Sequence, residues 1–358
     1  MRVLSPILHR VIYPALGSVG YFHSRRVAPI AVITYHGVLP AGYKSEDAFL
    51  DNTLVTEGAF RSQLRLLKKH YNVISPDEFL LWIRKRGDLP ERAILLTCDD
   101  GLLNHLNVMV PILKEEQLKC LFFLTGSSLG NAPTLLWYVE LYLMLMEAPA
   151  RNEPIHLRGI AISGLSADSG QRRVQWLTLV KRLSQVEAEA RSDFLKNAAA
   201  GLGLQPSWKM RYLDDPLLRD RFRVLRLPEL KQLANAGMTV GAHSLSHPIL
   251  AQQSAELAHT EIVGCRRALE ESLGERVWAI AYPFGDPASV GEREFRLAEE
   301  AGYDCGFVNV GGVLEAVSSK FRLPRVHVTA EMPLSVYEAH VSGFHQVVQE
   351  KFRAQGLT

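Results

Sequence analysis

Two short segments of this 358-residue chain carry carboxylate and imidazole side chains at spacings that suit a metal ion. In the first, Asp99, Asp100 and Gly101 directly follow the apolar run Ile94–Thr97. In parallel α/β folds, functional groups collect at the carboxyl ends of buried strands. Adjacent residues there point in different directions, so one carboxylate could bind a metal while the other stays free. An Asp-Asp-Gly turn that only caps the next helix is an alternative interpretation of this motif alone.

The second segment also follows a predicted strand and reads Gly241-Ala242-His243-Ser244-Leu245-Ser246-His247-Pro248. Its histidines are four residues apart, and on one helical turn that spacing puts both imidazoles on the same face. Two neutral imidazoles and one carboxylate suit Zn²⁺ or a similar first-row ion and leave positions for water and substrate. A lone histidine is more often structural. A pair at this spacing, in a chain that also has strand-end aspartates, favours a metal site.

Short apolar runs that alternate with helical patterns must position these residues. The runs predicted as buried strands are Ile30–Tyr35, Ile94–Thr97, Cys120–Thr125, Met238–Ala242, Val277–Ala281, Cys305–Val310 and Val326–Val328. The helices between them have recognisable ends, such as the N-cap and capping-box pair Ser75 and Glu78. Alternating strands and helices predict a mostly parallel α/β sheet. About seven such units favour closure into a (β/α) barrel over an open sheet.

One long segment, at about 133–226, lacks a clear strand and is predicted to be a helical insertion. Its helical patterns are Leu135–Glu147 and Val174–Ala200. The aromatic residues Trp137, Tyr138 and Tyr142 could face a ligand, although aromatic residues at helical spacing more often lie in a core.

Three motifs together resemble those of the polysaccharide deacetylases that share the NodB homology domain, carbohydrate esterase family 4. The family's T-F-D-D-G is matched by Thr97-Cys98-Asp99-Asp100-Gly101, its H-[ST]-x-x-H by His243-Ser244-Leu245-Ser246-His247, and its P-[YF]-G by Pro283-Phe284-Gly285. The resemblance covers about Ile30 to Val328 without the insertion. It implies a distorted seven-stranded barrel of the NodB type. The expected divisions are an N-terminal extension over residues 1–28, a catalytic domain over 29–345 and a tail over 346–358.

The resemblance also implies a role for each residue of the first two motifs. Asp99 is the implied general base, and Asp100, His243 and His247 are the implied metal ligands. The implied cofactor is one divalent ion, Zn²⁺ foremost, with Co²⁺, Ni²⁺ or Mn²⁺ as alternatives. Such an ion polarises a carbonyl and lowers the pKa of a water molecule, whose proton Asp99 could take.

The third motif and an early histidine are expected to border the substrate. The backbone N–H of Phe284 is the implied oxyanion donor, and Tyr282 and Pro283 are expected to contact the substrate. His36 follows the first predicted strand and is expected at the same site, with a buried structural role as the alternative. The implied activity is removal of an acetyl group, N-acetyl foremost, from a carbohydrate in bacterial exopolysaccharide, cell-wall or lipid-linked glycan metabolism.

The chain departs from the family pattern at three places. Cys98 stands where the first motif usually has an aromatic residue, and Ala281 stands where many members have an arginine that orients the base. That support is expected from elsewhere, with Arg322 and Arg325 as the candidates. The late L-x-x-H motif, which supplies the general acid, has no clean match, and His327 is the best candidate for this role. These departures keep open a glycan-binding homologue with impaired catalysis. A metal-dependent amidohydrolase acting on a non-sugar amide is a further alternative.

Composition limits the partners. The net charge of +2 gives no general case for nucleic-acid binding, and four scattered cysteines favour a reducing compartment, so a cytoplasmic location is expected. Residues 1–26 contain four arginines, no acidic residue and apolar residues at roughly helical spacing. They are expected to pack as an ordinary extension or, alternatively, to contact an anionic membrane at its inner face. Other histidines in helical patterns, namely His105, His259 and His340, are expected at the surface.

Overall fold

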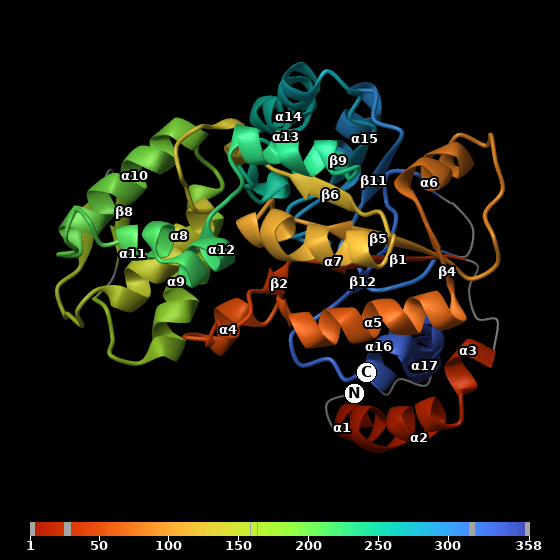
Figure 1. Cartoon of the computed structure of the whole chain (residues 1–358). Coiled ribbons are helices and arrows are strands. Elements are labelled where there is room, and N and C mark those ends of the chain that lie inside the picture. Colours follow the sequence, from red (N-terminus) through yellow and green to blue (C-terminus); the bar gives the residue numbers. More distant parts are fainter. Residues whose placement is uncertain (1–3, 25–29, 158, 163, 315–318, 355–358) are drawn as a thin grey trace.

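A parallel sheet of eight strands forms the centre of the molecule in the computed structural model, which describes residues 4–24, 30–157, 159–162, 164–314 and 319–354 (Figure 1). The strand order is β11-β10-β9-β6-β5-β1-β12, and β4 also pairs with β5. The strands are β1 (Ile30–Tyr35), β4 (Asn72–Ile74), β5 (Ala93–Cys98), β6 (Leu121–Leu124), β9 (Thr239–Ala242), β10 (Ala279–Ala281), β11 (Cys305–Phe307) and β12 (Val326–His327). All seven predicted strands are therefore present. The eighth, β4, was missed because it has only three residues and pairs only with the first half of β5.

One stretch of chain brings the two ends of the sheet together. The N–H groups of Leu323 and Val308 donate to the carbonyls of Gly306 and Leu323, each at 2.9 Å, so this stretch lies along β11. A few residues later the same stretch becomes β12, which pairs with β1. The sheet is thereby curled into a distorted barrel, as the sequence predicted.

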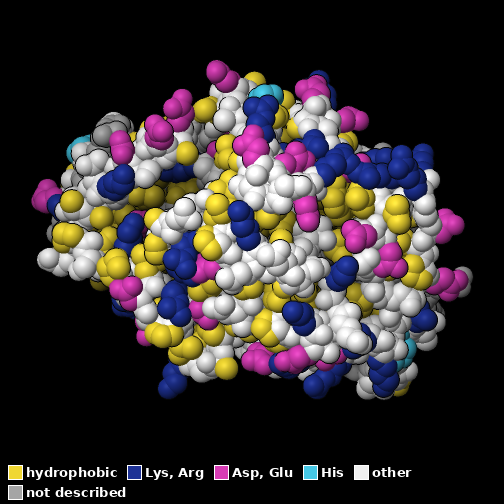
Figure 2. All heavy atoms as spheres, turned by 45° about the horizontal axis from the view of Figure 1, so that its top comes forward, with side chains coloured by type: hydrophobic (Ala, Val, Ile, Leu, Met, Phe, Trp, Pro, Cys, Tyr) yellow, Lys and Arg dark blue, Asp and Glu magenta, His cyan; other side chains and the backbone are white. Residues whose placement is uncertain are grey.

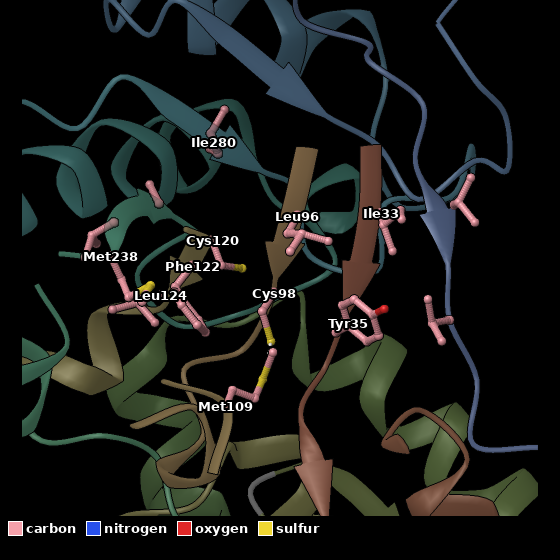
Figure 3. Packing of buried hydrophobic residues seen from close by; sticks show 14 of the residues in the cluster. Ile33, Tyr35, Leu96, Cys98, Met109, Cys120, Phe122, Leu124, Met238 and Ile280 are labelled. Atoms are coloured by element: carbon pink, nitrogen blue, oxygen red, sulfur yellow. Dashed lines mark hydrogen bonds between the residues drawn. The ribbon is translucent and has the colours of Figure 1, made fainter. Parts of the chain in front are cut away.

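Helices cover the outside of the sheet. They are α5 (Glu57–His70), α6 (Pro76–Ile83), the π-helix η2 (His105–Met109), α7 (Val110–Glu115), the 3₁₀ helices η3 (Gly126–Leu129) and η4 (Leu250–Gln252), α13 (Leu227–Asn235), α14 (Ala255–Leu273), α15 (Glu292–Glu300) and α16 (Leu334–Val341). The predicted capping box at the start of α6 is present, with the Glu78 N–H donating to Ser75 Oγ at 3.2 Å. Apolar faces of these helices pack on the sheet, and Figure 3 shows the sulfur atoms of Cys98 and Met109 in contact there, 3.6 Å apart.

The segment predicted as an insertion forms a second group of elements with its own hydrophobic core, at the left of Figure 1. Its elements are α8 (Trp137–Glu147), β7 (Ile155–Leu157), β8 (Ile160–Ile162), α9 (Ser169–Leu183), α10 (Ala188–Gly201), α11 (Met210–Asp214) and α12 (Pro216–Phe222). The prediction of one helix over Val174–Ala200 is wrong. The chain turns between α9 and α10, where the Ser184 hydroxyl accepts a hydrogen bond from the Ile249 N–H at 3.0 Å. The apolar periodicity continues through this turn and hides it.

A small parallel pair, β2 (Val38–Leu39) and β3 (Val55–Thr56), flanks the short helix α4 (Ala48–Asp51) between the sheet and the insertion. Ion pairs tie this segment to the insertion. Arg221 Nε lies 2.5 Å from Asp51 Oδ1, with both side chains buried, and Arg173 Nη2 lies 3.3 Å from Asp47 Oδ1.

The N-terminal arm consists of α1 (Leu4–Ile7), the π-helix η1 (Leu8–Ile12), α2 (Tyr13–Ser18) and α3 (Tyr21–Ser24). It packs on α16 through Tyr13 and Phe22, and the C-terminal helix α17 (Phe344–Ala354) lies beside it. Among the described residues, no helix combines the length and apolar character needed to cross a membrane. Figure 2 shows charges of both signs interspersed over one face of the molecule.

Candidate metal centre and pocket

The two aspartates of the first motif sit where β5 ends, in a backbone turn that separates their side chains. The Asp99 N–H donates to the Tyr35 carbonyl at 3.0 Å, which extends the pairing of β5 with β1. The next residues, Asp100 and Gly101, adopt the left-handed region with φ of 84° and 73°. With this backbone, the Asp100 carboxylate faces His243 and His247, whereas the Asp99 carboxylate faces Arg325.

The two histidines of the second motif lie in a loop after β9, and the expected helical turn is absent. The His243 N–H donates to the Leu124 carbonyl at 2.9 Å, and the His247 N–H donates to Ser244 Oγ at 3.0 Å. Ser244 and His247 both have left-handed backbones, with φ of 60° and 53°. A tight loop thus brings together the side chains that were expected on one face of a helix.

Asp100, His243 and His247 converge on one point. The Nε2 atom of His243 lies 3.5 Å from Asp100 Oδ1, and the Nε2 atom of His247 lies 3.3 Å from the same oxygen. All three residues are buried. His243 Nδ1 lies 2.7 Å from the Ala281 carbonyl, so Nδ1 carries the proton and Nε2 offers its lone pair. Two imidazoles and a carboxylate that face one another in this way fit a divalent first-row ion.

Asp99 is held by Arg325, which the sequence offered as one of two candidates. The two guanidinium nitrogens each lie 2.7 Å from a different carboxylate oxygen of Asp99, and both side chains are buried. Burial alone would raise the pKa of Asp99, but the charge of Arg325 and its hydrogen bonds outweigh burial and lower it. Asp99 is therefore an ionised carboxylate with a fixed orientation. Arg322, the other candidate, is exposed.

A pocket of about 370 Å³ opens over these residues. The pocket is lined by Asp99, Asp100, His243 and His247 of the first two motifs, and by Tyr282, Phe284, His36 and His327. Pro283, which was expected to contact the substrate, does not line it. Phe284 has a left-handed φ of 61°, and its ring lies 5.0 Å from that of His247. Tyr282 is almost completely buried, so it contributes more to the core than to the pocket surface.

His36 and His327 lie side by side in the pocket wall, with ring centroids 4.9 Å apart. His36 Nδ1 and His327 Nε2 are buried without a hydrogen-bond partner in the described part of the chain. Burial first, then the nearby His36 and Arg325, lower the pKa of His327 to about 3. His327 is thus a neutral imidazole that can present an N–H to a ligand.

Backbone strain is concentrated in the three motifs. Seven non-glycine residues in the described part of the chain have positive φ, and four of them, namely Asp100, Ser244, His247 and Phe284, belong to these motifs. Such conformations cost about 1–3 kcal/mol each and persist where the surrounding structure enforces them, which is common at functional sites.

Several pocket residues were not found from the sequence. They come from the segment around α4, from the insertion and from loops after β10 and β11: Phe49, Leu50, Asn52, Thr53, Trp176, Asp286 and Asn309. Among these residues, only Asp286 could have been suggested by the sequence, because it directly follows the third motif. Tyr138, for which the sequence allows either a ligand contact or a core position, lines the pocket, and Tyr142 lies in the core.

The expectation that His105 lies at the surface is wrong. Its side chain is completely buried, and its Nε2 lies 3.2 Å from the Cys98 sulfur. Burial raises the pKa of the Cys98 thiol well above its ordinary value and lowers that of His105 to about 4. Both groups are neutral structural supports beneath the first motif. His259 is exposed as expected, and His340 is half-buried.

A second group of three potential metal ligands, His9, His340 and His345, lies between the N-terminal arm and the C-terminal helices. The rings of His340 and His345 are stacked, with centroids 3.8 Å apart and planes inclined by 23°. Lone pairs of nearly parallel rings run side by side and do not meet at one ion. His345 is also hydrogen-bonded through Nδ1 to the Tyr13 hydroxyl at 2.8 Å. This group holds the arm in place.

Comparison with known proteins relates part of the sequence to polysaccharide deacetylases. Residues 218–306 match the family model described as polysaccharide deacetylase, a range that contains the second and third motifs. The putative polysaccharide deacetylase YxkH of Bacillus subtilis is 22% identical over 113 residues, which is 32% of this chain. The chain spans 39% of the length of this curated relative.

Solved structures share the fold. The Streptococcus pyogenes deacetylase PplD, solved with acetate, superposes with a TM-score of 0.54 at 19% identity and covers 87% of this chain and 97% of its own. IcaB from Ammonifex degensii superposes with a TM-score of 0.53 at 16% identity and covers 88% of this chain and 98% of its own. At these identities the similarity supports the barrel architecture.

Proposed function

We propose that the chain is a member of the polysaccharide deacetylase family and a metal-dependent hydrolase that removes an acetyl group from a carbohydrate, which the family-model match over residues 218–306, the similarity to YxkH and the shared fold support. The N-acetyl group is the foremost substrate, with O-acetyl and N-formyl groups as alternatives. One observation carries the proposal. Asp100, His243 and His247 converge beside Asp99, a separate carboxylate that Arg325 keeps ionised.

In the proposed reaction Asp100, His243 and His247 hold one divalent ion, Zn²⁺ foremost. When bound, the ion supplies Lewis-acid polarisation of the acetyl carbonyl and makes water more acidic. Asp99 accepts a proton as the water oxygen bonds to the carbonyl carbon. The Phe284 N–H lies in the strained third motif and is the proposed donor to the resulting oxyanion.

The C–N bond then breaks, and its electron pair goes to the leaving nitrogen together with a proton. We propose that His327 receives the proton that Asp99 takes from water and delivers it to this nitrogen, since its imidazole borders the pocket with an unpaired Nε2. Acetate and a free amine are the products. The neighbouring His36 is proposed to contact the sugar.

Acetate release from acetylated saccharides tests this proposal. Polymeric, nucleotide-linked and lipid-linked N-acetylated sugars should be assayed with the metal-depleted protein and after addition of Zn²⁺ or Co²⁺. We expect release from at least one class, dependent on added metal and absent in Asp100→Ala. Full activity in that variant would refute the proposal.

Two other outcomes would point to the alternatives. Saccharide binding without turnover by any metal-loaded form would indicate a glycan-binding homologue with impaired catalysis. The presence of both Asp99 and its buried arginine partner speaks against this alternative. Turnover confined to non-sugar amides would indicate a different amidohydrolase.

We further propose that the N-terminal arm contacts an anionic membrane at its cytoplasmic face, where a lipid-linked saccharide would be within reach. Ile7, Val11 and Val19 are exposed by 49%, 60% and 76% on the arm. Arg10 is exposed among them, and residues 1–26 contain no acidic residue, so charge repulsion from anionic lipids is absent.

Flotation with liposomes tests the membrane proposal. The full chain should float with liposomes that contain anionic lipid, and a Val11→Asp/Val19→Asp variant should remain in the soluble fraction. Equal flotation of the two proteins, or none by the full chain, would refute membrane contact without affecting the proposed chemistry.

A further inference from the structure

The insertion contacts the second motif directly through two of its helices, and a third contact holds the chain two residues after the motif. From α8, Trp137 Nε1 donates to the His247 carbonyl at 3.0 Å. From α10, Arg191 Nη2 donates to the Ser246 carbonyl at 3.2 Å, and its guanidinium lies over the Trp137 ring at 4.6 Å. Ser184, at the end of α9, accepts a hydrogen bond from the Ile249 N–H at 3.0 Å. The loop that carries both histidines is therefore shaped by the insertion as well as by the barrel.

Within α8, Tyr138 reaches the metal-ligand carboxylate itself. Its hydroxyl lies 3.4 Å from Asp100 Oδ2, whereas the two imidazoles face the other oxygen, Oδ1. Its ring lies 4.7 Å from the His247 ring and 5.8 Å from the Phe284 ring. Trp176 of α9 fixes the backbone at this point, since its Nε1 donates to the Tyr138 carbonyl at 2.8 Å.

We infer that Tyr138 is a positioning residue supplied by the insertion, which orients Asp100 for metal binding and forms the pocket wall above His247. This inference rests on the proposed function. A carboxylate that binds a cation through one oxygen is free to rotate unless its second oxygen has a partner. The phenol O–H donates to that second oxygen and keeps Oδ1 directed at the two imidazoles. Such outer partners change metal affinity or activity by about 10–100-fold when removed.

The other tyrosine of α8 shows that this placement is specific. Tyr142 lies one helical turn after Tyr138, is completely buried, and its hydroxyl donates to Asp47 Oδ2 at 2.6 Å, away from the motifs. The two phenols thus have different roles on one helix. The pocket lining includes Tyr138 and not Tyr142.

Replacement of Tyr138 by phenylalanine tests the inference because it keeps the ring and removes only the hydroxyl. Zn²⁺ affinity should be measured by competition with a chromophoric chelator, independently of turnover. We expect Tyr138→Phe to bind Zn²⁺ about tenfold more weakly, at the lower end of the range because the contact is long. At saturating Zn²⁺, kcat should fall while KM stays close to that of the parent chain. Tyr138→Ala, which also removes the wall, should raise KM as well.

Tyr212→Phe is the matched control. Tyr212 is a buried tyrosine of α11 whose hydroxyl donates to Glu147, remote from the motifs, so Zn²⁺ affinity should not change. Unchanged Zn²⁺ affinity and kcat in Tyr138→Phe would overturn the inference while the proposed function stands. If the parent chain itself binds no divalent ion at the motif residues, the proposed function fails first.

Discussion

The two groups of three potential metal ligands differ in geometry far more than in composition. His243 and His247 are inclined by 71° to each other, and both direct Nε2 at the same carboxylate oxygen. His340 and His345 are nearly parallel, and His345 has hydrogen bonds at both ring nitrogens, to the Tyr13 hydroxyl and to Gln349. From this geometry we expect a metal ion at the first group and none at the second.

The surroundings of the two groups explain this difference. At the motif site, a backbone carbonyl fixes the tautomer of His243, and the strained turns at Asp100 and His247 hold the donors on one point. At the arm, helices η1, α16 and α17 bring three imidazoles together through ring packing and hydrogen bonds. Outer contacts and backbone geometry distinguish a binding site from a packed cluster.

The largest effect should separate the two groups by metal content. Asp100→Ala should bind no Zn²⁺ and lose activity by about a thousandfold, because the polarising ion contributes several kcal/mol to the transition state. His345→Gln should keep one Zn²⁺ per chain and full activity. Metal content by mass spectrometry after dialysis, with acetate release, measures both. Two ions per parent chain, one of them lost in His345→Gln, would show that the histidines at the arm also bind a metal ion.

A second test concerns the buried ion pair beside the site. Arg325→Met should destabilise the chain by about 3–5 kcal/mol, because it leaves Asp99 charged and buried without a partner. Without the guanidinium the pKa of Asp99 rises. The acidic limb of the pH–activity profile should therefore move to higher pH. Arg322→Met, on an exposed side chain three residues earlier, should change neither quantity.

A double variant keeps this test informative if Arg325→Met fails to fold. Asp99→Asn/Arg325→Met removes both charges and should recover most of the stability without recovering activity. Urea unfolding gives the free energies. A double variant as unstable as Arg325→Met would show that the arginine acts through packing instead of through the charge on Asp99.

A smaller effect is expected from acid at the arm. Burial, then neighbouring histidines, lower the pKa of His340 to about 3 and of His345 to about 4, whereas an unfolded histidine has a pKa near 6.5. Between those values the unfolded state binds more protons, so stability falls as pH falls from about 6.5 toward 4. We expect the free energy of unfolding to fall by about 1–3 kcal/mol over this pH range, and to fall by less in His345→Gln. Melting temperatures across this range measure it, and equal slopes for both proteins would be contrary to this account.

The smallest expected effect is at the contact between α8 and the motif loop. Trp137→Phe removes the indole N–H that donates to the His247 carbonyl and keeps an aromatic ring under Arg191. One hydrogen bond contributes about 1 kcal/mol, so Zn²⁺ affinity should fall about fivefold. Trp208→Phe, in the same insertion, is the control, and chelator competition measures both. If Trp137→Phe binds Zn²⁺ as tightly as Trp208→Phe, the insertion affects the candidate metal centre through Tyr138 and not through Trp137.

The sequence was most informative where function and local structure depend on the same residues. The seven apolar runs are local features, and each became a strand of the sheet. Asp100, His243 and His247 follow two of these strands directly, and parallel strands end at one edge of a sheet, so their convergence could be predicted. The helical turn expected at His243 was wrong because spacing alone cannot distinguish a helix from a loop with two left-handed residues.

What lay beyond the sequence were the contacts between distant segments. The choice of Arg325 over Arg322 depends on which side chain of the closing stretch turns inward, and the burial of His105 depends on what packs over it. Tyr138 and Trp176 belong to helices whose aromatic residues suit a core as well as a pocket.

The sequence by itself determined the barrel strands, the donor residues of the candidate centre and their order along the chain, because these features repeat or lie next to one another. Only the tertiary structure decided which arginine accompanies Asp99 and which tyrosine of α8 reaches Asp100. Those outcomes depend on the relative position of segments about 40–230 residues apart, and no local pattern encodes a distance of that kind.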